Sequence, residues 1–463
     1  MVQGWGIAGS AGRWTLAGCG AALLLAIALL AGSGLRAEGA GLADGTHLGV
    51  GSCARSTCHG RQEPTGAVVR QDEIQRWQDE SSPAGAHSRA WRVLGGARGR
   101  SIAARLGIGD PQASPQCLGC HADPGATRGP MLQRSDGVTC EACHGGASTW
   151  LASHYAVGTS HARNVAQGMV ALDDPRVRAG VCLDCHFGSA APGQFVDHRL
   201  MAAGHPRIAF ELDLFTTMEQ HWNEDSDYAA RKGRPSNVKV WAVGQAEAVA
   251  RSLSLYAQPD LGTTGAFPEF YFFDCQTCHR RISDDPDYRP SAPVNPGRPV
   301  PLGFPAYQDE NMIMLSAAAA VAAPDAGRQF DAASRAFHAA LAQGRPQSLA
   351  AGAKLRASAL ALSARLSGAA LGPGETLAIL DRIASGAISD RFTDYEGCVQ
   401  AVMGVDTLLS ALVNQGAVSR DAAAGIRVDI NRAYAAVRDP NTFDPAGFQR
   451  ALGGAAASIR RLR

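Results

Sequence analysis

The pattern Cys-x-x-Cys-His occurs four times between residues 117 and 279, and it is the strongest constraint on what this chain can become. Two cysteines three positions apart lie on one side of a helical turn, so both thiols can bond to one edge of a planar ring. The histidine that follows can then place its imidazole beneath the centre of that ring. This spacing is typical of c-type haem attachment, with histidine as the proximal ligand of the iron. The motifs are Cys117, Cys120 and His121; Cys140, Cys143 and His144; Cys182, Cys185 and His186; and Cys275, Cys278 and His279.

A looser copy of the pattern, CARSTCH, precedes these four. Cys53 and Cys58 are separated by four residues instead of two, and His59 follows directly. Because two extra residues can loop out between the thiols, we predict a fifth haem c here; if this site is not used, the count is four. The alternative is a disulfide or an unrelated pair. Five haems would use ten of the twelve cysteines, leaving Cys19 near the N-terminus and Cys398, which we interpret as a small core residue.

Zinc is the main chemical alternative, since it also binds CxxC pairs. A structural zinc site needs four ligands and does not require a histidine directly after the second cysteine. Here the histidine follows in every copy of the motif, which favours haem iron.

Eight histidines lie outside the motifs and could supply the distal ligands of five irons. We expect mainly bis-histidine haems at low potential, because histidine is in surplus. The expected distal ligands are those within or beside the haem-binding run: His47, His87, His154, His198 and His205. His161 and His221 are reserves, and His338, which is far from every motif, is expected to be structural.

The composition agrees with an interior filled by cofactors. Aromatic residues make up only 6% of the chain, so a side-chain core alone would be thin. Lys and Arg number 43 against 42 Asp and Glu, and this balance gives no basic surface for nucleic acid.

The first residues resemble an export signal. Residues 1–37 combine Arg13 with an apolar run from Leu16 to Ala31, which predicts a cleaved signal peptide and a periplasmic protein. The alternative is an uncleaved segment that anchors the protein to the inner membrane, since 22 uncharged residues lie at the lower end of what spans a bilayer.

The rest of the chain divides at a proline-rich stretch. We predict a multihaem cytochrome c domain at 45–283, a linker at 284–307, and a helical C-terminal domain at 308–463. Thr393 to Glu396 fits a capping box, and Asp444-Pro445 fits a helix start. The predicted fold class is therefore mainly α with much irregular loop, followed by an antiparallel helical bundle. For this bundle we consider partner docking, self-association and simple stabilisation.

These residues resemble the multihaem c-type cytochromes related to the tetrahaem electron acceptor of hydroxylamine oxidoreductase. The resemblance covers roughly residues 45–280. It rests on four segments: Gly49-Val-Gly-Ser-Cys53 through Cys58-His59-Gly60, His87-Ser-Arg-Ala, Gly137-Val-Thr-Cys140-Glu-Ala-Cys143-His144-Gly145, and Val196-Asp-His198 with Ala203-Gly-His205-Pro206. It implies periplasmic electron transfer through closely packed haems. This chain departs from that group in its CxxxxCH site, in its predicted five haems rather than four, and in its long C-terminal region without haem motifs.

Three functions remain to be separated. The first is an electron-transfer protein that exchanges electrons with redox protein partners. The second is an oxidoreductase acting on a small nitrogen or sulfur compound, which requires one haem with an open position; the irregular first site is the candidate. The chain lacks CxxCK, the lysine-ligated motif of pentahaem nitrite reductases. The third is a membrane-anchored partner in quinol oxidation, which requires the N-terminal segment to be retained.

Overall fold

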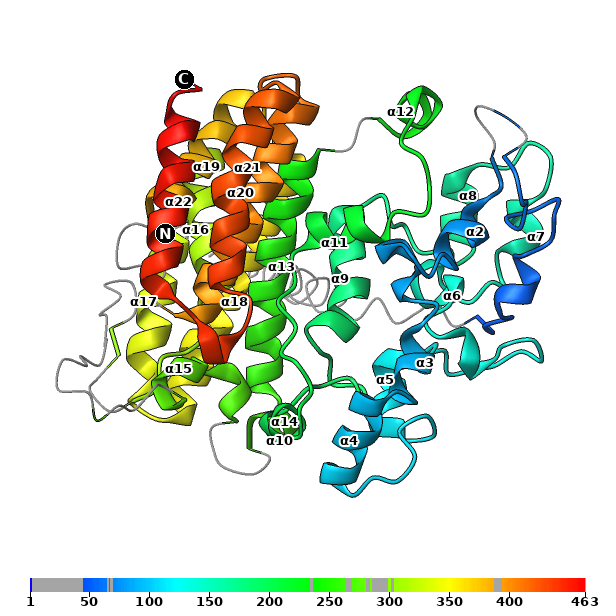
Figure 1. Cartoon of the computed structure of the whole chain (residues 1–463), viewed down its shortest axis with the longest axis horizontal. Helices are drawn as coiled ribbons and strands as arrows, with labels where there is room; N and C mark the ends of the chain where they lie inside the picture. The colour runs from blue at the N-terminus through cyan, green and yellow to red at the C-terminus, as the bar shows by residue number, and fades with distance from the viewer. Residues whose placement is uncertain are drawn as a thin grey trace.

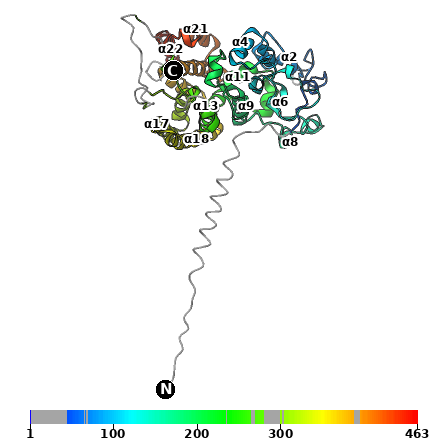
Figure 2. The same ribbon diagram turned by 90° about the horizontal axis from the view of Figure 1, so that it is seen from below.

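The computed structural model describes Met1 and residues 45–462, apart from 65, 67–69, 234–235, 264–268, 280–283, 285–298, 301–303 and 387–393. This described part is mainly helical, as predicted, with two isolated β-bridges and no longer strand. Figures 1 and 2 show a bundle of long helices beside a looser part made of short helices and loops. The predicted export signal with Cys19, and most of the predicted linker, lie outside the described residues.

The looser part consists of short helices joined by turns. Its α-helices are α2 (Glu73–Trp77), α3 (Ala90–Leu94), α4 (Ala97–Leu106), α5 (Pro115–His121), α6 (Cys140–His144), α7 (Leu151–His154), α8 (His161–Ala166), α9 (Pro175–His186), α10 (His198–Ala202), α11 (Leu212–Glu219) and α12 (Ser226–Lys232). Three 3₁₀ turns accompany them: η1 (Val50–Ser52), η2 (Pro83–Ala86) and η3 (Arg134–Asp136).

The sequence explains why these helices are short. α9 begins at Pro175 behind the Asp174 side chain, which accepts a hydrogen bond from the Arg176 amide, and it ends at His186, two residues before Gly188. Gly188 has a φ of 122°, which favours glycine and turns the chain away from the helix. α10 likewise starts behind Asp197 and stops before Gly204, whose φ is 110°. Such caps and stops place a histidine at or near a helix end.

The bundle contains the long helices. They are α13 (Asn237–Ala257), α16 (Glu310–Ala322), α17 (Pro324–Leu341), α18 (Arg345–Gly368), α19 (Pro373–Gly386), α20 (Tyr395–Asn414), α21 (Arg420–Ala436) and α22 (Pro445–Arg460). Between α13 and α16 lie α14 (Pro259–Thr263), η4 (Phe270–Phe272) and α15 (Cys275–Cys278), and η5 (Pro440–Thr442) precedes α22. Successive helices α17 and α18, and α21 and α22, pack against each other across short connections (Figure 1).

Of the two predicted helix starts, that of α22 is confirmed, whereas the capping residue of α20 lies one position later than predicted. Asp444 caps α22, its side chain accepting a hydrogen bond from the Gly447 amide, and Pro445 is the first helical residue. At α20 the capping side chain is Asp394 rather than Thr393, with the Gly397 amide donating at 2.6 Å. Thr393 itself lies outside the described residues.

The hydrophobic core belongs almost entirely to the bundle. One large cluster of buried side chains runs through α13 and α16 to α22, and includes Trp241, Phe330 and Phe448. In the looser part the clusters are small, such as Val50 with Ile74 and Trp77. A polypeptide of this size without a side-chain core needs another source of buried apolar surface, which agrees with the expectation that cofactors supply it.

The bundle begins earlier in the sequence than the predicted boundary at residue 308. α13 is buried at most of its positions and packs on α16, α18 and α20. Gly404 of α20 allows this close approach, because a Cβ there would lie 3.4 Å from both the Trp241 indole nitrogen and the Met314 sulfur. In the sequence, the proline-rich stretch therefore lies between two helices, α13 and α16, that pack against each other.

α20 is long and apolar enough to pass a length-and-hydropathy test for a membrane span. However, 78% of its most apolar window is buried within the protein. Its apolar surface is therefore accounted for by packing against the neighbouring bundle helices.

The two parts meet through α9, α11 and α13. Leu183 and Leu212 form a buried cluster with Val240 of α13. Polar contacts add to it: Gln400 of α20 donates to the Phe210 carbonyl at 2.8 Å, and Thr407 donates to the Glu211 carboxylate at 2.9 Å. The bundle is thus bound to the histidine-bearing part by both apolar and polar contacts.

Candidate haem-binding site

Four of the five attachment motifs lie on short helices. α5, α6 and α9 each end at the motif histidine, and α15 ends one residue before His279. The two cysteines of each motif are therefore one turn apart on the same helix face, as the spacing predicts.

The first motif is a compact turn instead of a helix. The Cys53 carbonyl accepts a hydrogen bond from the His59 amide at 3.1 Å, and the Arg55 carbonyl accepts one from the Cys58 amide at 2.8 Å. Gly60 closes the turn, since a Cβ there would collide with the Ala54 carbonyl. The two additional residues are absorbed in this turn, and His59 remains next to the thiols.

Each of the five motif histidines faces a histidine from outside the motifs. The distances between ring centres are 6.0 to 6.4 Å. Two imidazole nitrogens on opposite sides of one metal ion, each about 2 Å away from it, place the ring centres roughly 6 Å apart. In motif order, the first to fifth pairs are His59 with His154, His121 with His205, His144 with His221, His186 with His87, and His279 with His198.

Most of the expected distal histidines take part in these pairs. His87, His154, His198 and His205 each face a motif histidine. His221, which sequence reasoning kept only as a reserve, completes the set of five distal histidines and lies opposite His144 of the third motif. The other reserve, His161, forms an ion pair with Asp173 at 3.0 Å.

His47 differs from the expectation that it is a distal ligand. It is 1% exposed, and its Nδ1 lies 2.7 Å from the Asp123 carboxylate. Burial lowers the pKa of His47, but the hydrogen bond and charge of Asp123 outweigh it, so this pKa lies above its ordinary value. Thr139 donates to the same carboxylate. His47 is therefore part of a buried polar cluster that fixes the N-terminal segment.

His338 agrees with its expected structural role. It is fully buried on α17, with its ring against Phe337 and Tyr307. Cys398 is likewise 1% exposed within the bundle core. Both side chains are therefore buried in the bundle.

Hydrogen bonds orient several of the paired imidazoles. Nδ1 of His59 contacts Glu73 at 2.9 Å, and Nδ1 of His121 contacts the Ala90 carbonyl at 2.8 Å. When one ring nitrogen is held in this way, the other is directed toward the opposing ring, as in ligands of metal sites.

Burial keeps two of the imidazoles neutral. It lowers the pKa of His144 to about 4 and that of His186 to about 4. A neutral imidazole has the free lone pair that an iron ligand needs. These two histidines are thus prepared to bind metal at neutral pH.

Neighbouring motifs lie close enough for their thiols to touch. The Cys53 and Cys140 thiols are within hydrogen-bonding reach of each other. The same holds for Cys120 and Cys185, and the Cys120 sulfur lies 3.9 Å from the Cys185 carbonyl. Charge interactions also link Cys143 to both cysteines of the fourth motif. The first four pairs therefore follow one another in the order first, third, fourth, second.

α10 connects the second pair to the fifth. His198 begins this helix and faces His279, whereas His205 follows it and faces His121. The left-handed Gly204 turns the chain between them, so two histidines seven residues apart serve different motifs.

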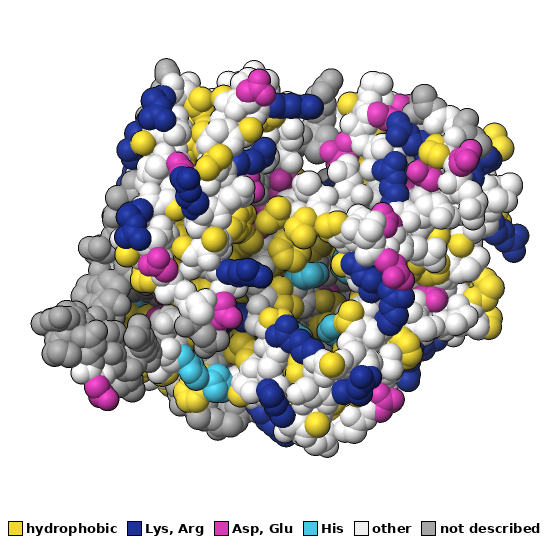
Figure 3. All heavy atoms as spheres, in the orientation of Figure 1, with side chains coloured by type: hydrophobic (Ala, Val, Ile, Leu, Met, Phe, Trp, Pro, Cys, Tyr) yellow, Lys and Arg dark blue, Asp and Glu magenta, His cyan; other side chains and the backbone are white. Residues whose placement is uncertain are grey.

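Large apolar side chains are exposed beside several pairs. Tyr155 and Val157 follow His154 and are 73% and 106% exposed, and Phe270 packs edge-on to His198. Figure 3 shows hydrophobic side chains and histidines together in the hollow between the bundle and the looser part. Exposed apolar surface beside opposed imidazoles fits the faces of a porphyrin.

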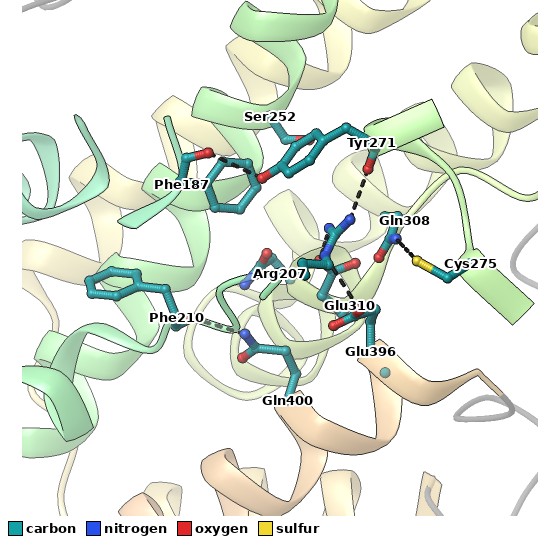
Figure 4. A network of polar contacts seen from close by, with 12 residues as sticks. Phe187, Arg207, Phe210, Ser252, Tyr271, Cys275, Gln308, Glu310, Glu396 and Gln400 are labelled. Atoms are coloured by element: carbon teal, nitrogen blue, oxygen red, sulfur yellow. Dashed lines mark hydrogen bonds and ion pairs between the residues drawn. The ribbon is translucent and has the colours of Figure 1, made fainter. Parts of the chain in front are cut away.

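The fifth motif is built against the bundle (Figure 4). Gln308, just ahead of α16, donates to the Phe273 carbonyl at 2.7 Å and lies 3.9 Å from the Cys275 sulfur. Nearby, Arg207 is buried between Glu310 and Glu396, with both nitrogen–oxygen distances at 3.4 Å. Side chains of the bundle thus hold the segment that carries this motif.

Comparison with known families agrees with these motifs. Residues 52–145 match the family described as cytochrome c554 and c-prime, and this range includes the first three motifs. The match supports a c-type cytochrome that binds haem covalently and transfers electrons. No curated protein and no solved structure matches the chain.

Proposed function

We propose that this chain is a pentahaem c-type cytochrome that transfers electrons between redox proteins through mainly bis-histidine haems. The observation that carries the proposal is the opposition of all five motif histidines to a second imidazole at 6.0 to 6.4 Å. Haem iron, when bound, supplies one-electron oxidation and reduction.

The residues of this chain have distinct roles in the proposal. The ten motif cysteines would attach the porphyrins through thioethers, and the five motif histidines would be the proximal ligands. His87, His154, His198, His205 and His221 would be the distal ligands. The hydrogen-bond partners of these rings would fix their orientation and adjust the potential of each iron.

Electron transfer is favoured over catalysis by the same geometry. A catalytic haem needs an open or displaceable position for substrate. The irregular first site was the candidate for such a position, but its His59 faces His154 like the other four. We therefore retain the oxidoreductase only as the outcome that would contradict the proposal.

The order of the pairs supports a continuous route. Thiol contacts link the first motif to the third and the fourth to the second, charge interactions link the third to the fourth, and α10 links the second pair to the fifth. The route would lead from the outer edge of the looser part to the helical bundle. Partners would then exchange electrons at its two ends.

The location and partners are part of the proposal. Residues 1–37 have the composition of an export signal, which supports a periplasmic protein, anchored to the inner membrane if that segment is retained. The resemblance to the electron acceptor of hydroxylamine oxidoreductase supports redox proteins as donor and acceptor. The bundle would serve as a docking or self-association surface.

A haem count and a spin-state measurement test the proposal together. A pyridine haemochrome assay on protein matured with the c-type attachment machinery should give five haems per chain. The double variant C53A/C58A should give four, because only the irregular motif is removed. Electron paramagnetic resonance of the oxidised wild type should be uniformly low-spin; a high-spin signal that shifts with nitrite or hydroxylamine would support the oxidoreductase instead.

A further inference from the structure

One carboxylate lies between two of the histidine pairs. Glu219, the last residue of α11, has its Oε1 2.9 Å from Nδ1 of His221 and 3.9 Å from Nδ1 of His87. His221 faces His144 of the third motif, and His87 faces His186 of the fourth. Both distal imidazoles of these two neighbouring pairs therefore approach the same side chain.

The attachment thiols place Glu219 between the same two motifs. Burial raises the pKa of Cys143 and of Cys182, and the negative charge of Glu219 raises both further. Cys143 belongs to the third motif and Cys182 to the fourth. The carboxylate is thus electrostatically close to both motifs from the cysteine side as well as from the distal side.

The Glu219 carboxylate lies within hydrogen-bonding distance of Nδ1 of His221 and within ion-pairing distance of Nδ1 of His87. A carboxylate that accepts a hydrogen bond from Nδ1–H fixes the ring and makes the other nitrogen a stronger electron donor to iron. A stronger donor stabilises ferric iron more than ferrous iron, so the potential falls.

Among the residues that the structure describes, no other carboxylate lies within 4 Å of imidazoles from two different pairs. Glu73 lies within hydrogen-bonding distance of one imidazole, that of His59 at 2.9 Å, and reaches His221 of the third pair only through its charge. In the second pair both contacts are to neutral carbonyls, with His121 against Ala90 and His205 against Pro206. Glu219 is therefore distinguished by its contact with two distal imidazoles that belong to different motifs.

Building on the proposed function, we infer that Glu219 is a positioning residue shared by the third and fourth haems. It orients both distal imidazoles and lowers the potentials of both irons together. The second and third positions of the route would then be matched to each other by a single side chain.

The test is a redox titration of the five-haem protein with E219Q. Glutamine keeps the size of the side chain and removes its charge. Two of the five one-electron steps should rise, each by an equilibrium factor on the order of tenfold, or about 59 mV for one electron. E73Q is the matched control: it removes a direct contact with one ring, so its largest rise should be confined to one step. H221M and H87M identify the affected steps, because methionine ligation raises the potential of its own haem.

The outcomes are distinguishable. A rise in one step only, or in none, overturns the shared role, as does a rise in steps that H221M and H87M do not mark. If E219Q loses a haem, E219D carries the test, because its shorter arm withdraws the carboxylate from both rings and must raise the same two steps. A wild-type protein without five low-spin haems would contradict the proposed function itself, whatever the behaviour of Glu219.

Discussion

Two imidazoles in this chain, His47 and His221, both contact a carboxylate, but their surroundings differ. His47 is enclosed by polar groups around Asp123, and none of the histidine pairs in the described part of the chain includes it. His221 has Glu219 on one side and His144 on the other. The opposing ring, rather than the carboxylate, therefore separates a candidate iron ligand from a structural histidine.

Replacing these two histidines should have different effects, one on the spin state of an iron and the other on the stability of the fold. H221A should leave one haem without a distal ligand and produce a high-spin signal from one of five irons, since the cysteines still attach the porphyrin. H47A should leave all five irons low-spin and instead reduce the free energy of unfolding by about 1–3 kcal/mol, because Asp123 is left buried without its partner. Electron paramagnetic resonance and urea unfolding measure the two effects. A high-spin signal in H47A, or its absence in H221A, would contradict the assignment.

At the level of single residues, most of the candidate site could be predicted from the sequence. The exception is the choice of His47 instead of His221 as a distal ligand, and it has a physical reason. The spacing within each motif is local, so all five motif histidines were recognisable from the sequence. The pairing is not local, because the two members of each pair are 77 to 99 residues apart. Nearness to a motif favoured His47 over His221, but only tertiary structure brings His221 to His144. No local pattern beside His221 marks it as a ligand, because a carboxylate also contacts the structural His47.

Among the helices, α13 shows what sequence patterns do not reveal. It is buried on nearly all sides, so its apolar residues have no single face, and no amphipathic pattern assigns it to the bundle. The prolines after residue 285 then suggested a boundary within the region that α13, α16 and α20 span together. By contrast, Asp444-Pro445 marked the start of α22 correctly, because a cap depends only on neighbouring residues.

The contact between α13 and α20 can be tested through glycine. G404L should force a side chain between Trp241 and Met314 and lower the free energy of unfolding by about 1–3 kcal/mol, the usual effect of overpacking. Gly425 of α21 is the matched control, because a Cβ there would meet no atom within 4 Å. G425L should be neutral or slightly stabilising, since leucine favours helix more than glycine does. Equal urea midpoints for the two variants would contradict the close packing.

Across the whole molecule, the stability should depend on pH through buried acids at the contact between the two parts. Burial raises the pKa of Glu396 from 4.5 to about 7, although Arg207 opposes the shift. The folded protein therefore holds this proton more firmly than the unfolded chain does. The resulting stabilisation is complete below pH about 4.5 and is lost as the pH rises toward about 7.

The variant E396Q should flatten this dependence. Glutamine cannot ionise, so the loss of stability between pH 5 and 7.5 should shrink by up to about 3 kcal/mol relative to wild type. Some dependence should remain, because burial also raises the pKa of Glu211 to about 7. Urea unfolding at the two pH values, followed by circular dichroism, measures the difference. An unchanged dependence would show that Glu396 does not titrate in this range.

The Arg207 side chain links the histidine-bearing part of the molecule to the helical bundle. It follows His205 by two residues and reaches Glu310 and Glu396 on two bundle helices. A displacement of either helix would pull on the backbone that aims the His205 ring. We therefore expect strain applied to α16 or α20 to change the optical absorbance of the haem proposed at the second motif.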